Sequence, residues 1–136
     1  MTLSLAVSVS PIYISLIALL ALVLGGVIVR FRISGKVDLG DDGSREMLSA
    51  IRAHANLIEW APIILLLLLV SELLGFNSLF LHIMGASLVV GRIAHGFGMI
   101  KGKGGVHKGR FYGTIITWLV LIILSVANLL AAFGLI

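Results

Sequence analysis

Four long apolar stretches, separated by three short polar segments, make up the pattern of hydrophobic and polar positions along the chain. The stretches cover approximately residues 8–31, 45–74, 78–100 and 110–133. Each is long enough for a helix that crosses a bilayer, which requires about 20 mostly apolar residues. The pattern therefore predicts an all-α membrane protein, a bundle of four transmembrane helices that forms a single domain over residues 1–136.

The polar segments contain residues that typically start and stop helices. Pro11 suits the first turn of the first helix, where a backbone N–H has no partner. An Asp-Asp-Gly turn precedes Ser44, which is a suitable N-cap for the second helix, and Gly75 is a natural stop for that helix. Residues 33–44 and 101–109 are therefore expected to form the two longer loops.

The composition excludes a soluble domain of this size, because 60% of the residues are hydrophobic, only 12% are charged, and the mean hydropathy is +1.18. The chain contains no cysteine, so disulfides and thiolate metal sites are excluded, and any thiol chemistry requires a thiol from the substrate. The net charge of +4 arises from the loops of a membrane protein and does not indicate a nucleic-acid partner.

Eight of the ten lysines and arginines lie at one set of helix ends, around the first and third polar segments. Loops rich in these residues stay in the cytoplasm, so we predict that both termini lie on the opposite side. The first stretch is expected to be retained, because its positive charges follow the apolar core rather than precede it. The eight residues are Arg30, Arg32, Lys36, Arg45, Lys101, Lys103, Lys108 and Arg110.

The second stretch carries a stripe of polar residues along one side. At 100° per residue, Arg52, Asn56 and Glu59 fall within roughly 60° of one another, and Arg45 and Ser49 continue the stripe. Ionisable groups in a membrane-spanning segment are costly, so they usually face a bundle interior or cavity and mark a functional site. The alternative is a buried Arg52–Glu59 pair, with a hydrogen bond from Asn56, that only fixes helix packing.

The third stretch ends in a second polar cluster, in which Arg92, His95 and Met99 share one face. The small residues Gly91 and Gly98 allow close contact between helices, and we expect this face to contribute to subunit assembly. Because Arg92 and His95 lie towards the same end as the polar stripe of the second stretch, the two clusters are expected to meet.

The combined groups provide several cations, an amide and one carboxylate. This set suits a zwitterionic ligand with more than one carboxylate, because arginine binds carboxylates through paired, charge-assisted hydrogen bonds and Glu59 can bind an ammonium. The chain has neither the Ser-His-Asp arrangement of a hydrolase nor the ligand spacing of a zinc site, so we expect no metal.

These residues also carry a family resemblance. The motifs are Arg52-x-x-x-Asn56-x-x-Glu59-x-x-Pro62, preceded by Arg30-x-Arg32 and followed by Gly91-Arg92-x-Ala94-His95. Together with the four-span layout, they make the chain resemble the MAPEG family, the membrane-associated proteins in eicosanoid and glutathione metabolism, over nearly its whole length. It looks most like the small bacterial members, which implies an integral protein of a bacterial inner membrane, and residues 90–95 are similar to the prostaglandin E synthase branch.

The resemblance implies a homotrimer that binds glutathione, as co-substrate, between neighbouring subunits near the cytoplasmic side. The implied function is that of a glutathione transferase or peroxidase-like enzyme acting on lipophilic electrophiles from the bilayer. Family enzymes lower the pKa of the glutathione thiol with an arginine, because the thiolate is the reactive species. The candidates for this arginine are, in order of preference, Arg110, Arg32 and Arg30. The residues implied to bind glutathione are Arg52, Asn56, Glu59, Arg92 and His95.

Two other functions stay open. Several family enzymes have tyrosines on the third helix at positions that match His95 and Met99, and their absence here favours a non-catalytic scaffold that binds glutathione or lipid. The other alternative is a small transporter or channel-like bundle. The gathering of polar groups near one face, without a pair of broken helices at the bilayer midplane, counts against transport.

Overall fold

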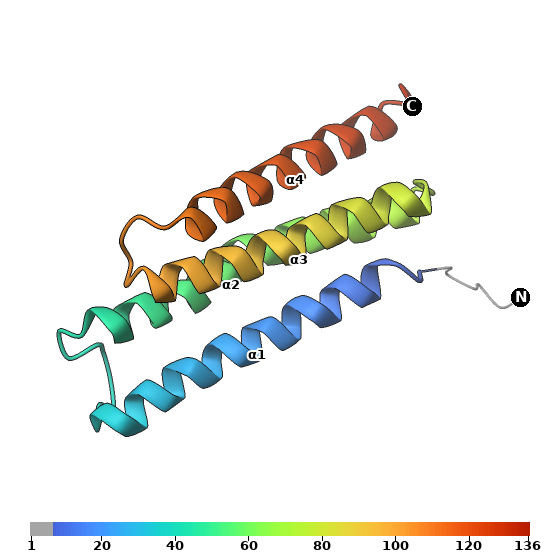
Figure 1. The fold of residues 1–136 in the computed structure, drawn as a ribbon. Coiled ribbons are helices and arrows are strands. Elements are labelled where there is room, and N and C mark those ends of the chain that lie inside the picture. Colours follow the sequence, from blue (N-terminus) through green and yellow to red (C-terminus); the bar gives the residue numbers. More distant parts are fainter. Residues whose placement is uncertain (1–6) are drawn as a thin grey trace, which may run out of the picture.

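The chain folds into four long helices with short connections (Figure 1). The computed structural model describes residues 7–136, so residues 1–6 of the predicted domain lie outside the described part. The helices are α1 (Ser10–Gly35), α2 (Arg45–Leu73), α3 (Ser78–Lys101) and α4 (Lys108–Ala132). Each is long and apolar enough to cross a membrane, and no strand occurs within residues 7–136. The predicted all-α bundle of four membrane-spanning helices is confirmed.

α2 and α3 form the centre of the bundle, and α1 and α4 flank them (Figure 1). The most extensive contact joins α3 to α4, whereas α1 and α4 do not touch each other. The two basic connections lie at one end of the bundle, and the start of α1 and the C-terminus lie at the other (Figure 1). The eight cations near the helix ends therefore gather on one side, which we call the basic-loop end.

The ends of α1 and α2 follow capping geometry rather than the distribution of charges. Ser44 caps α2 as predicted, since its Oγ accepts a hydrogen bond of 3.2 Å from the backbone N–H of Met47. α1 continues to Gly35, four residues past its predicted end at residue 31. Charged side chains end an apolar span without breaking a helix, and α1 stops only where Lys36 adopts a left-handed conformation with φ 54°.

The start of α4 also differs from the prediction. The helix begins at Lys108, two residues earlier than expected. The ring of His107 accepts a hydrogen bond of 3.0 Å from the backbone N–H of Gly109 and so satisfies a free donor of the first turn. This side-chain cap offsets the low helix propensity of the glycine.

Glycines bring α3 and α4 into contact backbone to backbone. A Cβ built on Gly98 of α3 would lie 2.3 Å from the backbone nitrogen of Arg110, and one built on Gly113 of α4 would lie 2.5 Å from the carbonyl oxygen of Gly91. Neither position accepts a larger side chain unless a helix moves. Gly91 and Gly98 of α3 therefore pack against α4 of the same subunit, so these two glycines give no support to the expected subunit assembly.

Polar contacts at the end opposite the basic loops hold the helices together. The carboxylate of Glu72 accepts hydrogen bonds of 2.7 Å from the backbone N–H groups of residues 8–10, which ties the start of α1 to the end of α2. The hydroxyl of Ser71 donates a hydrogen bond of 2.8 Å to Oδ1 of Asn128, which ties α2 to α4. These contacts join the helices at this end of the bundle. The candidate site lies at the basic-loop end.

Candidate functional site

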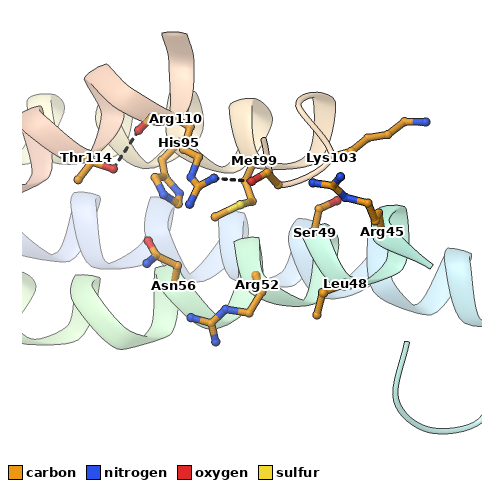
Figure 2. Close-up of a pocket in the computed structure, with 11 residues that line it drawn as sticks. Arg45, Leu48, Ser49, Arg52, Asn56, His95, Met99, Lys103, Arg110 and Thr114 are labelled. Atoms are coloured by element: carbon orange, nitrogen blue, oxygen red, sulfur yellow. Dashed lines mark hydrogen bonds between the residues drawn. The ribbon is translucent and has the colours of Figure 1, made fainter. Parts of the chain in front are cut away.

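A polar cleft opens at the basic-loop end, between the first half of α2, the last turns of α3 and the start of α4 (Figure 2). Its volume is about 370 Å³. Figure 2 shows residues of α2 along one side of the cleft, opposite His95 on α3 and Arg110 on α4. The lining residues are Arg45, Leu48, Ser49, Arg52, Asn56, His95, Met99, Lys103, Gly104, Arg110 and Thr114.

The cleft is strongly cationic. No acidic residue lines it among the described residues, whereas four cationic residues do. A concave site with one sign of charge concentrates ligands of the opposite sign, and arginines add paired donors that fit carboxylates. The cleft therefore favours a small anionic ligand with carboxylate groups. The four cationic residues are Arg45, Arg52, Lys103 and Arg110.

The two polar clusters meet, as the sequence predicts, through the buried side chain of Arg92. Its Nη2 donates a hydrogen bond of 2.7 Å to Oδ1 of Asn56, and its Nη1 donates a longer one of 3.4 Å to Oγ1 of Thr117. The same guanidinium lies 3.3 Å from Nδ1 of His95. Arg92 itself does not line the cleft, but it positions two side chains that do, Asn56 and His95.

Glu59 lies beside Arg52 at the edge of the cleft rather than in it. The two side chains form an ion pair of 3.4 Å and are 49% and 51% exposed, respectively. The alternative of a buried pair that only fixes helix packing is therefore wrong for the isolated subunit, because half of each side chain is uncovered.

The length of α2 places this pair relative to the bilayer. Its 29 residues extend about 43 Å, which exceeds the roughly 30 Å of hydrocarbon. If the far end of α2 lies at the membrane boundary, the hydrocarbon begins about 20 residues earlier, near His54. Arg52 then lies at the interface and Glu59 lies inside the hydrocarbon, where an exposed carboxylate requires cover from another molecule.

Arg110 lines the cleft and also holds the connection between α3 and α4. Its Nη1 donates hydrogen bonds to the carbonyl oxygens of Gly104 at 2.6 Å and Gly105 at 3.2 Å. Lys103 in the same connection forms an ion pair of 2.6 Å with Glu46 at the start of α2. These contacts attach the connection to α2 and form the border of the cleft at this end.

The other two candidate arginines do not line the cleft of their own subunit. Nη1 of Arg32 donates a hydrogen bond of 3.1 Å to the carbonyl oxygen of Gly40 in the connection between α1 and α2. Arg30 is exposed on α1. Any role for Arg30 or Arg32 in the chemistry of a cleft therefore requires a second subunit, whereas Arg110 is in place within one subunit.

Sequence reasoning missed the polar stripe on α4. Thr114 lines the cleft and Thr117 accepts a hydrogen bond from Arg92. Together with Arg110, these threonines repeat the i, i+4, i+7 spacing of the stripe on α2, and this spacing in an apolar helix was the available signal. The contribution of Lys103 could not be found this way, because it depends on how the glycine-rich connection folds.

Comparison with known proteins agrees with this geometry. The MAPEG family matches residues 10–130, a range that reaches from the first residue of α1 into the last turn of α4. The chain is also 36% identical over 121 residues to the inner membrane protein YecN of Escherichia coli K12 and, equally, to YecN of Escherichia coli O6:H1. Each alignment covers 89% of this chain and 90% of the relative.

The relatives and the four apolar helices agree that this is an integral membrane protein. The family match covers most of the chain, and the identity to YecN extends over nearly the whole length of both proteins. The two motifs that carry the resemblance, on α2 and α3, are joined in the fold by the bond between Asn56 and Arg92. The chain therefore belongs to the MAPEG family, which includes glutathione transferases and related membrane proteins.

Proposed function

We propose that the protein is a membrane-bound glutathione transferase or peroxidase-like enzyme that acts on lipophilic electrophiles. The observation that carries this proposal is the cleft lined by four cationic residues and an amide. Glutathione carries two carboxylates and one ammonium, so its net negative charge complements this lining. Membership of the MAPEG family, which includes such transferases, supports the same assignment.

The side chains divide between the charged groups of glutathione. Arg52 and Arg45, on one side of the cleft, bind carboxylates by paired hydrogen bonds. Glu59, which lies 3.4 Å from Arg52 at the edge, binds the ammonium. Asn56 and His95, both positioned by Arg92, supply neutral hydrogen-bonding groups between them.

Arg110 is the residue assigned to thiol activation. Its positive charge beside the bound thiol favours the thiolate and so lowers the pKa of that thiol. In conjugation, the thiolate sulfur forms a bond to the electrophilic carbon as the bond to the leaving group breaks, and the thiol proton passes to solvent or to the leaving group. In peroxide reduction, two glutathione molecules are oxidised to the disulfide while a hydroperoxide is reduced to an alcohol and water.

An apolar pocket beside the cleft would receive the lipophilic substrate. It has a volume of about 450 Å³ and shares Gly104, Arg110 and Thr114 with the cleft. Arg110 therefore lies where the two cavities meet, which is where the thiolate and an electrophile would have to meet. The other lining residues are Gly105, Val106, His107, Phe111, Ile115 and Trp118.

We infer that the working form is a homotrimer. A single subunit leaves about half of the Arg52 and Glu59 side chains exposed. Charged groups inside a membrane must be shielded from lipid, so a neighbouring subunit is needed to cover them. The number three comes from the family resemblance. A neighbouring subunit would also offer Arg30 or Arg32 to the cleft. Mass measurement in detergent is expected to give a trimer, and a stable monomer with full glutathione affinity would contradict this inference.

The non-catalytic scaffold is the second candidate, and one feature of the cleft favours it. Met99 lines the cleft, and its thioether cannot donate a hydrogen bond to a thiolate or to a substrate oxygen. In a scaffold, glutathione would bind through its carboxylates and its thiol would stay protonated at neutral pH. The state of the bound thiol therefore separates the two functions.

The test is the ultraviolet absorbance of the thiolate of bound glutathione, measured against pH. The wild type is expected to show thiolate near neutral pH. Arg110→Gln should leave glutathione affinity nearly unchanged and shift the appearance of thiolate to higher pH, because removal of the positive charge raises the pKa of the bound thiol. Arg110→Lys is the matched control that keeps the charge. The same measurement on Arg32→Gln and Arg30→Gln tests whether either of these arginines lowers the pKa of the bound thiol instead.

Two results would overturn the proposal that the protein is an enzyme. If the wild type binds glutathione but shows no thiolate near neutral pH, the scaffold is the better function. If glutathione does not bind at all, the protein has the MAPEG fold without this ligand.

A further inference from the structure

Among residues 7–136, no acidic side chain forms an ion pair with Arg92. Arg92 is only 2% exposed, and the groups around its guanidinium are Oδ1 of Asn56, Oγ1 of Thr117 and Nδ1 of His95. The ion pairs among residues 7–136 join Arg52 to Glu59 and Lys103 to Glu46, so neither includes Arg92. A buried charge that is hydrogen-bonded only to neutral groups is costly in a membrane-spanning helix.

One donor of this guanidinium also lacks a partner. The Nε of Arg92 is buried and makes no hydrogen bond within the described residues. Buried donors are nearly always satisfied, so this unpaired N–H adds to the cost of burying the cation. A negatively charged group close to the guanidinium would offset this cost.

Arg92 also lines a small pocket. Its volume is about 140 Å³, which accommodates a small anion together with some water, since one water needs only about 10–15 Å³. The pocket is separate from the polar cleft, although Asn56 and Thr114 line both. Arg92 is its only charged lining residue, and the complete lining is Asn56, Trp60, Arg92, Thr114, Thr117 and Trp118.

We propose that this pocket is a binding site for one monovalent anion held on Arg92. The anion lies against the Arg92 side chain and neutralises the buried charge. The chemistry required is a single negative charge of small size, which either a free halide or a carboxylate group can provide. The site shares Asn56 and Thr114 with the cleft assigned to glutathione, but its cation, Arg92, does not line that cleft.

The two tryptophans of the chain make the site observable. Trp60 and Trp118 are the only tryptophans in the sequence, their rings lie 6.2 Å apart, and both line the pocket. Iodide quenches tryptophan fluorescence on contact, so the probe is sodium iodide added to the purified protein in neutral detergent. Ionic strength is held constant with sodium gluconate, and a sample with gluconate alone gives the unquenched baseline.

The wild type is expected to show a saturable phase of quenching in addition to the linear collisional phase. Arg92→Gln should lose the saturable phase. Asn56→Asp keeps Arg92 but should also lose the saturable phase. Its carboxylate lies beside the guanidinium and neutralises the charge that would otherwise bind the anion. Arg52→Gln is the matched control: it removes the same charge from the neighbouring cleft and should change the half-saturating iodide concentration less than twofold.

The source of the anion is identified by competition with salts that do not quench. Displacement of iodide by chloride but not by acetate identifies a free halide, and displacement by acetate at similar concentrations identifies a carboxylate group. Purely linear quenching of the wild type would overturn the proposal. An unchanged saturable phase in Asn56→Asp would also overturn it, and this variant keeps the test valid if Arg92→Gln does not fold.

Discussion

Arg92 of α3 and Asn56 of α2 are joined by a hydrogen bond of 2.7 Å that connects the two polar motifs of the sequence. The bond crosses from a residue that is 2% exposed to one that lines the cleft. It therefore couples the packing of α2 on α3 to the shape of the site. A change at Asn56 should affect the stability of the bundle as well as the binding of a ligand.

We expect Asn56→Ala to lower the free energy of unfolding by about 1–3 kcal/mol, because it leaves a buried charged donor without its shortest hydrogen bond. Unfolding in a denaturing detergent, followed by circular dichroism, measures the change. Asn56→Asp is the matched comparison, since it keeps an acceptor at the same place, and it should be at least as stable as the wild type. Equal stability of the alanine variant and the wild type would show that the bond contributes nothing.

The ion pair at the edge of the cleft should contribute to affinity rather than to stability. Arg52→Ala and Glu59→Ala are each expected to weaken glutathione binding by about 1.5–3 kcal/mol, or roughly 10- to 150-fold, the usual loss for a charge-assisted hydrogen bond. Titration calorimetry measures this change. Lys108→Ala is the control, because it removes one exposed positive charge that lines no part of the cleft. A similar loss in that control would mean that only net charge matters.

The glycine contacts between α3 and α4 should be sensitive to a single methyl group. A Cβ on Gly113 would lie 2.7 Å from the backbone nitrogen of His95, so Gly113→Ala must push the helices apart. We expect a loss of about 1–3 kcal/mol in unfolding free energy, the usual cost of overpacking. Thermal unfolding of the variant and the wild type measures this loss of stability.

The control for this prediction is Gly26→Ala in α1, where an added Cβ has nothing within 4 Å. That change should be neutral or slightly stabilising, because alanine favours a helix more than glycine does. If both glycine variants behave alike, close packing of α3 on α4 is not what sets their stability.

The topology predicted from charge is tested with reporter fusions. A reporter placed after Lys36, in the connection between α1 and α2, should report the cytoplasm, and one placed after Ile136 should report the opposite side. The reason is that the eight clustered cations keep the basic-loop end in the cytoplasm. Identical signals from the two fusions would exclude a four-span topology with both termini on one side.

Local features of the sequence determined most of the fold. The four helices follow from the length of the apolar stretches, and the start of α2 follows from the side chain of Ser44. The meeting of the two polar clusters was also predictable, because helical spacing places Arg92 and His95 on one face near the same end as Asn56. The helices and their caps depend on residues within a few positions of one another, and the short connection between α2 and α3 brings the two clusters together.

The tertiary structure decided which charges become buried and which reach the cleft. Arg110, Arg32 and Arg30 all lie at the basic-loop end, and only the close approach of α4 to α3 at Gly98 places Arg110 in the cleft. Glu59 shares a stripe with Asn56 yet stays half exposed, whereas Arg92 is only 2% exposed. Burial depends on side chains that other helices contribute, and the spacing of residues along one helix does not contain that information.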